Sequence, residues 1–235
     1  MSKDKLLPSL QKGLDGIQQL RASIESKETR PKLLKTLRPY VKSELVYKAF
    51  EVVDRANFAP PAFQHLAYSD EVIPLGKDSS ISQPSVIAEM IEALGLTGNE
   101  RVLEVGTASG YTAALLSFCA KEVDTIENNP DLAQTAQERL ATHGYKNVTV
   151  YTGNGILGIP ERALFDTIIV TAAAEKEIPP ALIEQIKVGG RIVIPIGKVE
   201  GDQNLVLGVK QEKELIIKQM FGVRFVPLVG LPAGN

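Results

Sequence analysis

The most informative segment of the chain is Arg101-Val-Leu-Glu-Val-Gly-Thr-Ala-Ser-Gly-Tyr111. Its apolar start predicts a short buried strand over 101–105, its glycines predict a tight turn over 106–110, and a helix is expected over 111–120. A strand, a glycine-containing turn and a helix in this order bring backbone N–H groups and a helix N-terminus close to a ligand. The stretch therefore predicts a ligand site where this strand ends.

Two acidic residues accompany the predicted turn. Glu104 lies at its mouth, where a carboxylate meets a cation, a hydrogen-bond donor or the N–H groups of the turn itself. Glu127 ends the next predicted strand, 122–127, and follows Gly106 by 21 residues. A carboxylate at this spacing is typical of a residue that binds ribose hydroxyls. The alternative for Glu127 is a solvated strand end.

The spacing of the glycines distinguishes two classes of ligand. A turn that binds the pyrophosphate of a dinucleotide follows the pattern G-x-G-x-x-G, because the phosphates lie directly on the backbone. Here Ala108 replaces the second glycine and Tyr111 the third. The turn therefore favours S-adenosylmethionine, whose nucleoside carries an amino acid and no phosphate, over a dinucleotide. A turn that only packs strand against helix is the structural alternative.

Strands and helices alternate along the second half of the chain. Helices are expected over 111–120, 130–142 and 179–187, and strands over 101–105, 122–127, 147–151, 165–171 and 191–196. After Gly197, further strands are expected over 204–209, 214–220 and 223–229. This order predicts an α/β fold: a doubly wound parallel sheet with antiparallel C-terminal strands. The turns that follow its first three strands then meet at one edge of the sheet.

Composition limits the classes of function. The chain has 235 residues, 44% of them hydrophobic, and a net charge of −2, so charge gives no reason to expect a nucleic-acid or membrane partner. With Cys119 as the only cysteine and two histidines, an intrachain disulfide is excluded and no metal site is expected. Cys119 fits a buried helix position. Without a long apolar run or a signal-peptide pattern, we expect a soluble, cytoplasmic protein.

The N-terminal residues 1–54 form a predicted helical extension ahead of a domain over 55–235. Apolar residues recur at helical spacing over 1–25, which predicts one apolar stripe. The stripe must cover the body of the protein, which we favour, or a partner such as a second copy of the chain; a membrane surface is the least favoured. A second helical stretch over 33–54 is expected to break at Pro39.

Hydroxyl groups precede another predicted helix. Ser80-Ile-Ser-Gln-Pro84 leads into apolar residues at helical spacing, which end at Gly95. Ser82 in this place is either a helix N-cap, which stabilises by about 1 kcal/mol, or a ligand of a carboxylate together with the free N–H groups of the helix start. Both roles are compatible. The preceding segment, 58–76, is rich in proline and is expected to be irregular.

Several motifs, in the right order over about residues 55–229, resemble those of the protein-L-isoaspartate O-methyltransferases. They are Ser80-Ile-Ser-Gln-Pro84, Val102-Leu-Glu-Val-Gly-Thr-Ala-Ser-Gly-Tyr111, Phe165-Asp-Thr-Ile-Ile-Val-Thr-Ala-Ala173, Ile178-Pro179 with Ala181-Leu182, Gly189-Gly190, Ile194-Pro-Ile-Gly197 and Arg224-Phe-Val-Pro-Leu228. The turn is common to many methyltransferases, whereas the first and last motifs are more particular to this family.

The resemblance implies a Rossmann-like methyltransferase that transfers a methyl group from S-adenosylmethionine to the carboxylate of an L-isoaspartyl residue and so starts the repair of damaged proteins. It implies that Ser82 is the site serine and that Arg224, Phe225, Val226 and Pro227 bind the substrate through main-chain groups. The cofactor is expected to contact Ser80, Ile81, Ser82, Glu104, Gly106, Thr107, Ala108, Ser109, Gly110, Glu127, Asn128, Asn154, Gly155 and Thr171.

Two residues in this site depart from the family's pattern. Ala108 stands where the family usually has glycine, so we expect its methyl group to crowd the methionine part of the cofactor or to force φ below zero in the turn. Asn154 stands where the family usually has aspartate, but its carbonyl oxygen can still accept a hydrogen bond from the adenine amino group.

Three alternatives follow from these departures and from the N-terminal stripe. The first is a methyltransferase of the same fold that acts on a different carboxylate or on a modified peptide. The second is a cofactor-binding protein without transfer activity, whose N-terminus binds a partner. A dinucleotide-dependent dehydrogenase is the least favoured, because the glycine pattern is broken.

Overall fold

The computed structural model describes residues 29–76 and 79–230. The predicted apolar stripe over 1–25 lies outside these residues. A helix over 29–37 leads into the 3₁₀ turn η1 (Arg38–Tyr40), which contains Pro39, and α2 (Glu44–Val52) follows. The predicted break at Pro39 is therefore confirmed.

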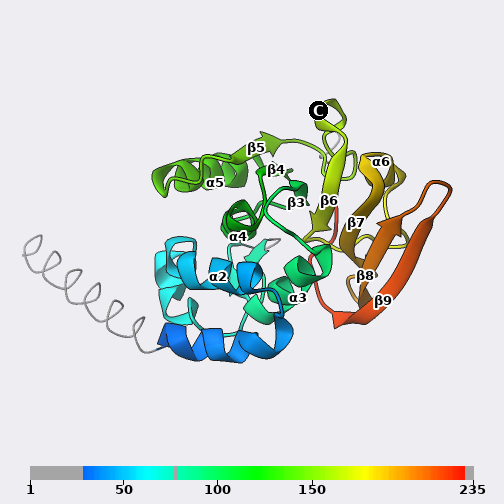
Figure 1. The fold of residues 1–235 in the computed structure, drawn as a ribbon. Coiled ribbons are helices and arrows are strands. Elements are labelled where there is room, and N and C mark those ends of the chain that lie inside the picture. The colour runs from blue at the N-terminus through cyan, green and yellow to red at the C-terminus, as the bar shows by residue number, and fades with distance from the viewer. Residues whose placement is uncertain (1–28, 77–78, 231–235) are drawn as a thin grey trace, which may run out of the picture.

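The remaining elements follow the alternation that the sequence predicts (Figure 1). The helices are η2 (Arg55–Asn57), η3 (Pro61–Leu66), α3 (Pro84–Leu94), α4 (Tyr111–Cys119), α5 (Pro130–Thr142), η4 (Pro160–Arg162) and α6 (Pro180–Glu184). The strands are β1 (Ile73–Pro74), β2 (Ser80–Ile81), β3 (Arg101–Val105), β4 (Glu122–Glu127), β5 (Val148–Thr152), β6 (Phe165–Val170), β7 (Ile186–Gly197), β8 (Gln203–Lys210) and β9 (Leu215–Val223). No helix in the described ranges is long and apolar enough to cross a membrane.

The central sheet has seven strands in the order β5-β4-β3-β6-β7-β8-β9. The first five in this order are parallel, whereas β8 and β9 add to β7 in antiparallel fashion. The strand order reverses beside β3, so the carboxyl end of β3 lies at the switch point where sheets of this kind bind ligands. The predicted fold class is confirmed.

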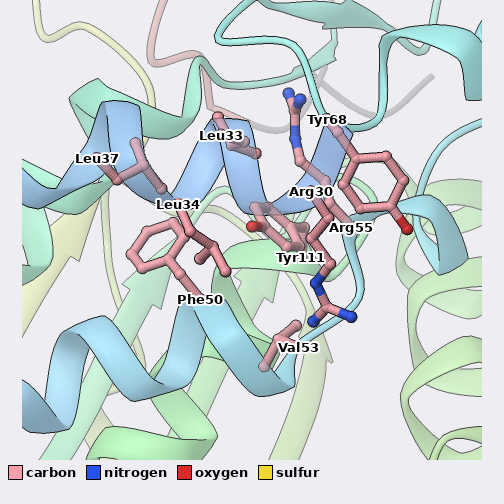
Figure 2. A pocket seen from close by; sticks show the side chains of 9 residues that line it. All are labelled: Arg30, Leu33, Leu34, Leu37, Phe50, Val53, Arg55, Tyr68 and Tyr111. Carbon is pink, nitrogen blue, oxygen red and sulfur yellow. The ribbon is translucent and has the colours of Figure 1, made fainter. Parts of the chain in front are cut away.

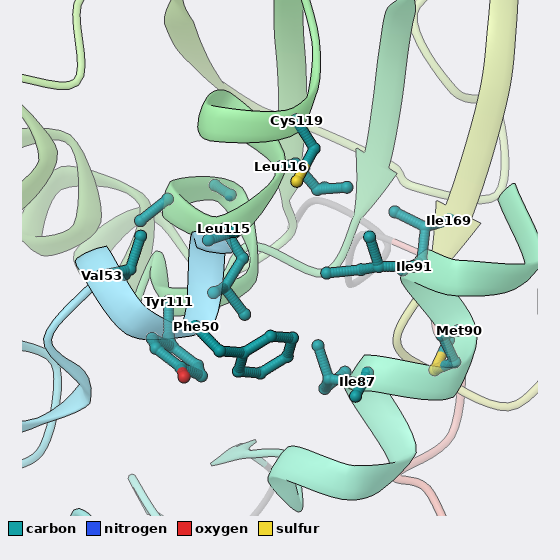
Figure 3. Close-up of a cluster of buried hydrophobic side chains, with 14 of the residues drawn as sticks. Phe50, Val53, Ile87, Met90, Ile91, Tyr111, Leu115, Leu116, Cys119 and Ile169 are labelled. Atoms are coloured by element: carbon teal, nitrogen blue, oxygen red, sulfur yellow. The ribbon is translucent and has the colours of Figure 1, made fainter. Parts of the chain in front are cut away.

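Alternating side chains of the sheet enter two cores. Val102, Val123 and Ile169 face a core that also contains residues of 29–37, α2, α3 and α4. Figure 3 shows how Phe50, Ile87 and other side chains from these helices meet there. Leu103 and Ile168, on the opposite face, pack against α6 and the loop before it. Cys119 is buried in the first core, as predicted, and burial raises the pKa of its thiol to about 12.

The end of the predicted helix 179–187 and the predicted strand 223–229 are wrong. Residues 186–187 belong to β7 and not to a helix, because Ile186 pairs with Phe165 of β6 and buries its side chain completely. Residues 224–229 do not continue as a strand: β9 ends at Val223, and beyond it only an isolated bridge joins Pro227 to Ala173. The chain leaves the sheet here and crosses toward the carboxyl end of β6.

Candidate active site

The predicted turn follows β3 and is held by its neighbours on both sides. The N–H of Gly106 donates to the Ile126 carbonyl of β4 over 2.9 Å. On the other side, the Thr171 hydroxyl donates to the Gly106 carbonyl, also over 2.9 Å. Gly106 has a φ of +100°, and a Cβ on it would collide with the Thr171 hydroxyl. Thr171, predicted as a cofactor ligand, thus supports the turn through its side chain.

The backbone conformation at Ala108 differs from the negative φ that we gave as one expectation. Its φ is +48°, so the turn keeps the left-handed backbone that glycine usually supplies and is not forced to a negative φ. An L-residue in this region is strained by roughly 1–2 kcal/mol. The backbone N–H of Ala108 donates to Glu127 over 2.9 Å, which helps to hold the strained conformation.

We expect Ala108→Gly to raise the free energy of unfolding by about 0.5–1 kcal/mol, because relief of this strain exceeds the added entropy of the unfolded chain. Urea unfolding measures the change. Ala141→Gly, on the exposed face of α5, is the matched control and should lower stability by about 1 kcal/mol. Equal losses in both variants would contradict the strain at Ala108.

Glu127 lies beside this turn, as predicted. One oxygen of its carboxylate accepts from Ala108, and the other accepts from the N–H of Asn129 over 3.1 Å. The side chain is largely buried, so it is not a solvated strand end. Each carboxylate oxygen can accept a second hydrogen bond, which leaves capacity for ribose hydroxyls. Asn128, the next residue, is half-buried.

Glu104 lies deeper than predicted and does not bond the N–H groups of the turn. Its side chain is fully buried, and one oxygen accepts from the Thr125 hydroxyl over 2.6 Å. Thr125 in turn lies 2.6 Å from the Thr107 hydroxyl. Within the described residues the other oxygen, Oε1, has no hydrogen-bond partner. Burial, and to a smaller extent the negative charge of Glu127, raises the pKa of Glu104 to about 8.

The third turn, which follows β5, is hydrogen-bonded to the second turn, which follows β4. The N–H of Gly153 donates to the Glu127 carbonyl over 2.9 Å. Asn154 uses its side-chain carbonyl to accept from the N–H of Ile156 over 3.0 Å, which closes a local turn. A second lone pair on this oxygen stays open for an adenine amino group. Gly155 is buried against Val105, with no room for a side chain.

The segment Ser80–Pro84 is organised by residues that sequence analysis missed. Ser82 is not the N-cap of α3; Gln83 is, and its side chain caps no N–H group. Asp70 takes the capping role, because its carboxylate accepts from the N–H of Ser85 over 2.8 Å and from the Gln83 amide over 3.1 Å. A carboxylate of the chain itself therefore already satisfies part of the helix start that we expected to be free.

Arg55 is the second missed residue. Its side chain is buried, and its guanidinium donates to the carbonyl of Ser82 over 3.1 Å and to four carbonyls over residues 66–71. The guanidinium also lies 5.7 Å from the ring of Tyr111, the first residue of α4. Arg55 thereby connects the segment around Ser82 to the helix that follows the cofactor turn. It also lines a small cavity below residues 29–37, which contains no predicted site residue (Figure 2).

The C-terminal segment, 224–228, reaches the same edge of the sheet. The Val226 carbonyl accepts from the N–H of Ala173, and the N–H of Leu228 donates to the Ala173 carbonyl, both over 2.8 Å. The side chain of Leu228 lies against Gly155. Arg224 and Pro227 are exposed. The segment therefore runs from the end of β6 to the third turn.

No local sequence pattern indicates the roles of Arg55 and Asp70. Pro60, Pro61 and Pro74 mark residues 58–76 as irregular, and irregular sequence carries no periodicity from which to place a side chain. Nothing near the arginine in the sequence indicates that it is buried. In the described part of the chain, no three His, Cys, Asp or Glu side chains are grouped to hold a metal ion.

The residues present fit S-adenosylmethionine. The glycine turn exposes backbone at the switch point, and Glu127 places a carboxylate beside it. The unpaired oxygen of Glu104 is a buried acceptor suited to a cationic amino group. The fold and this site define the class of Rossmann-like methyltransferases.

Comparison with known proteins narrows the class to one family. The model of the protein-L-isoaspartate(D-aspartate) O-methyltransferase family matches residues 28–233, and the chain belongs to this family. A protein-L-isoaspartate O-methyltransferase of Xanthobacter autotrophicus is 48% identical over 184 residues, which cover 78% of this chain and 84% of the relative. One of Ignicoccus hospitalis is 45% identical over 193 residues, 81% of this chain and 91% of the relative.

Two solved structures resemble this chain in fold. A protein-L-isoaspartate O-methyltransferase superposes with a TM-score of 0.77 at 31% identity over 86% of this chain, which spans 66% of that longer one. A second structure, of a Plasmodium falciparum protein in complex with S-adenosyl-L-homocysteine, has a TM-score of 0.73 at 24% identity and covers 84% of this chain and 97% of its own. The second comparison supports the fold.

Proposed function

We propose that this chain transfers the methyl group of S-adenosylmethionine to the free carboxylate of L-isoaspartyl residues in damaged proteins or peptides, and so initiates their repair. The observation that carries the proposal is the placement of two family segments: 224–228 bonds Ala173 after β6, and Arg55 links Ser82 to Tyr111, the first residue after the cofactor turn. A peptide held by one segment and oriented by the other lies at the carboxyl edge of the sheet.

The proposed reaction requires the protein mainly to align its two reactants. S-adenosylmethionine supplies an electrophilic methyl group on a sulfonium. An isoaspartyl carboxylate is ionised at neutral pH and needs no general base, so its alignment in line with the methyl–sulfur bond supplies most of the rate. The Ser82 hydroxyl orients the carboxylate by a hydrogen bond. In the segment 224–228, extended backbone pairs with the peptide main chain and so tolerates different side chains.

In this proposal each turn binds a different part of the cofactor. Glu127 binds the ribose, Asn154 and Gly155 bind the adenine, and residues 106–110 bind the methionine part. Glu104 lies in β3 just before the turn, and its unpaired oxygen would hold the cationic amino group of the methionine part. Ser80 and Ile81 form β2, which pairs with β1, and they would contact the cofactor beside Ser82.

We expect Glu127→Ala to weaken the binding of S-adenosylhomocysteine by roughly 1–3 kcal/mol, because charge-assisted hydrogen bonds to the ribose are lost. Isothermal titration calorimetry measures the affinity. Glu138→Ala, on the exposed side of α5, removes the same charge elsewhere and should leave the affinity unchanged. An affinity of Glu127→Ala within about twofold of the starting protein would remove this residue from the cofactor site.

The function is tested with two synthetic peptides that carry either L-isoaspartate or L-aspartate at the same position. Transfer of labelled methyl to the first alone supports the proposal. Transfer to neither, while S-adenosylhomocysteine still binds, would mean that the substrate is another carboxylate or that the chain binds the cofactor without transfer.

In the same assay, Ser82→Ala should lower turnover of the isoaspartyl peptide by about tenfold or more, because the carboxylate loses an orienting hydrogen bond. Binding of S-adenosylhomocysteine should stay within about twofold. Ser117→Ala, whose hydroxyl bonds only within α4, is the matched control. Equal turnover in Ser82→Ala and the starting protein would exclude Ser82 from the reaction.

The organisation and setting of the protein are further proposals. We keep a division into an N-terminal extension, 1–54, and a methyltransferase domain, 55–235, although Leu37 and Phe50 already share the core of α3 and α4. A cytoplasmic location and a homodimer or partner contact through the N-terminal helix are proposed from the sequence. Size-exclusion chromatography with light scattering tests the assembly.

A further inference from the structure

Gln203 is a buried side chain that the reaction described above does not use. It is the first residue of β8 and is 3% exposed. Its amide oxygen accepts from the N–H of Phe225 over 2.7 Å, and its amide nitrogen donates to the Phe225 carbonyl over 3.1 Å. One side chain therefore satisfies both polar backbone groups of a residue in the segment 224–228.

This pairing replaces a missing stretch of sheet. Gln203 is the register partner of Val223, the last residue of β9, and the chain before Gln203 turns away at residues 198–202. Among the described residues no strand pairs with Phe225, so the side-chain amide bonds it as a peptide group would. The side chain of Phe225 packs into the first core, the one that contains Val102 and Ile169.

The pairing also sets where the flanking residues lie. Val226 and Leu228 bond Ala173 on the β6 side, whereas Phe225 bonds Gln203 on the β8 side. The segment is thus fixed between two anchors, and Arg224 and Pro227 remain exposed. Without the Gln203 anchor, the backbone groups of Phe225 lose their partner, and the bonds to Ala173 and the packing of the Phe225 ring are left to hold the segment.

We propose that Gln203 is a positioning residue for the peptide substrate: its side-chain amide holds Phe225 and thereby presents the extended segment Arg224–Leu228 to the peptide main chain. This inference rests on the proposed function. It assigns to Gln203 an effect on the KM for the peptide and none on the binding of the cofactor, since its bonds reach no cofactor turn.

The test compares Gln203→Met with the unmodified protein. Methionine keeps the length of the side chain but loses both bonds to Phe225 and also the longer bond, 3.4 Å, to the Lys198 carbonyl. At saturating S-adenosylmethionine we expect the KM for the isoaspartyl peptide to rise about tenfold or more, with kcat reduced by less than about threefold. The affinity for S-adenosylhomocysteine should stay within about twofold. Asn147→Ala is the matched control, because this amide binds backbone carbonyls of residues 117–121, away from the segment 224–228.

Gln203→Glu gives a second readout. Its carboxylate can still accept from Phe225 but cannot donate, so its KM should also rise near pH 8. As the pH is lowered to about 6, a buried carboxyl gains its proton and with it the donor, and the KM should return toward that of the unmodified protein. Should Gln203→Met not fold, this variant decides the question.

If the unmodified protein is active and both variants of Gln203 have an unchanged KM for the peptide, the role of Gln203 is overturned while the proposed function stands. An equal rise in KM for Asn147→Ala would overturn it as well, since any loss of stability would then suffice. If the starting protein binds S-adenosylhomocysteine but methylates no isoaspartyl peptide, the proposed function fails, and the inference with it.

Discussion

Glu104→Gln should make the protein more stable in alkaline solution and leave it nearly unchanged in acid. In the folded protein the pKa of Glu104 is raised to about 8, chiefly by burial. In the unfolded chain the pKa returns to about 4.3. Between these two values the folded state holds a proton that the unfolded chain has released, so stability falls as the pH rises.

The size of this effect follows from the shift. The contribution is fully present below about pH 4.3 and is lost by about pH 8, and it amounts to roughly 3–5 kcal/mol. Glutamine is a permanently neutral isostere that can still accept from the Thr125 hydroxyl. The variant therefore does not lose this stability as the pH rises. We expect a melting temperature about 5–10 °C above that of the starting protein near pH 9.

Differential scanning calorimetry near pH 5 and near pH 9 checks this prediction. Glu212→Gln, on an exposed turn between β8 and β9, controls for the removal of a negative charge and should shift neither melting temperature. A difference of the same size at both pH values would show that Glu104 is ionised in the folded protein. The variant should also bind S-adenosylmethionine more weakly, because a nearby cationic amino group favours the ionised carboxylate of Glu104, whereas an amide oxygen can accept a hydrogen bond but carries no charge.

Arg55→Met should produce the second large effect, a loss of about 3–5 kcal/mol in the free energy of unfolding. The guanidinium satisfies five carbonyls at residues 66, 67, 69, 71 and 82, and no carboxylate shares it in an ion pair within the described residues. Removal takes away the shared donor of these carbonyls, most of which lie in half-buried places, although the Leu66 carbonyl keeps its bond from the N–H of Ser69. Arg55→Lys should recover little, because an ammonium cannot reproduce the planar fork that spans them.

Urea unfolding gives the stability of both variants. Arg191→Met is the matched control, since Arg191 donates to a single backbone carbonyl, that of Ala93, and should lose only about 1 kcal/mol. Because Arg55 also holds the carbonyl of Ser82, turnover of the isoaspartyl peptide should fall further in Arg55→Lys than in the control at equal folded fraction. A loss of stability below about 1 kcal/mol would contradict the role of Arg55.

Much of the fold was predictable because its signals are local. The apolar strands β3, β4 and β6, the prolines that open helices and the glycines that close them are read along the chain without knowledge of distant contacts. The ends of elements were less accurate. Residues 186–187 look helical locally, but Ile186 gains more by pairing with β6 and burying its side chain.

The sequence by itself determined the parallel sheet, the glycine turn after β3 and the carboxylate of Glu127 beside it, because spacing along alternating strands and helices places them at one edge. Only the tertiary structure decided that Ala108 keeps a positive φ, that Glu104 is buried without a full set of partners, and that Asp70 caps α3. It also decided that Arg55 and Gln203 hold the two segments around the site. These features arise from hydrogen bonds between residues far apart in the chain, whose partners no local pattern specifies.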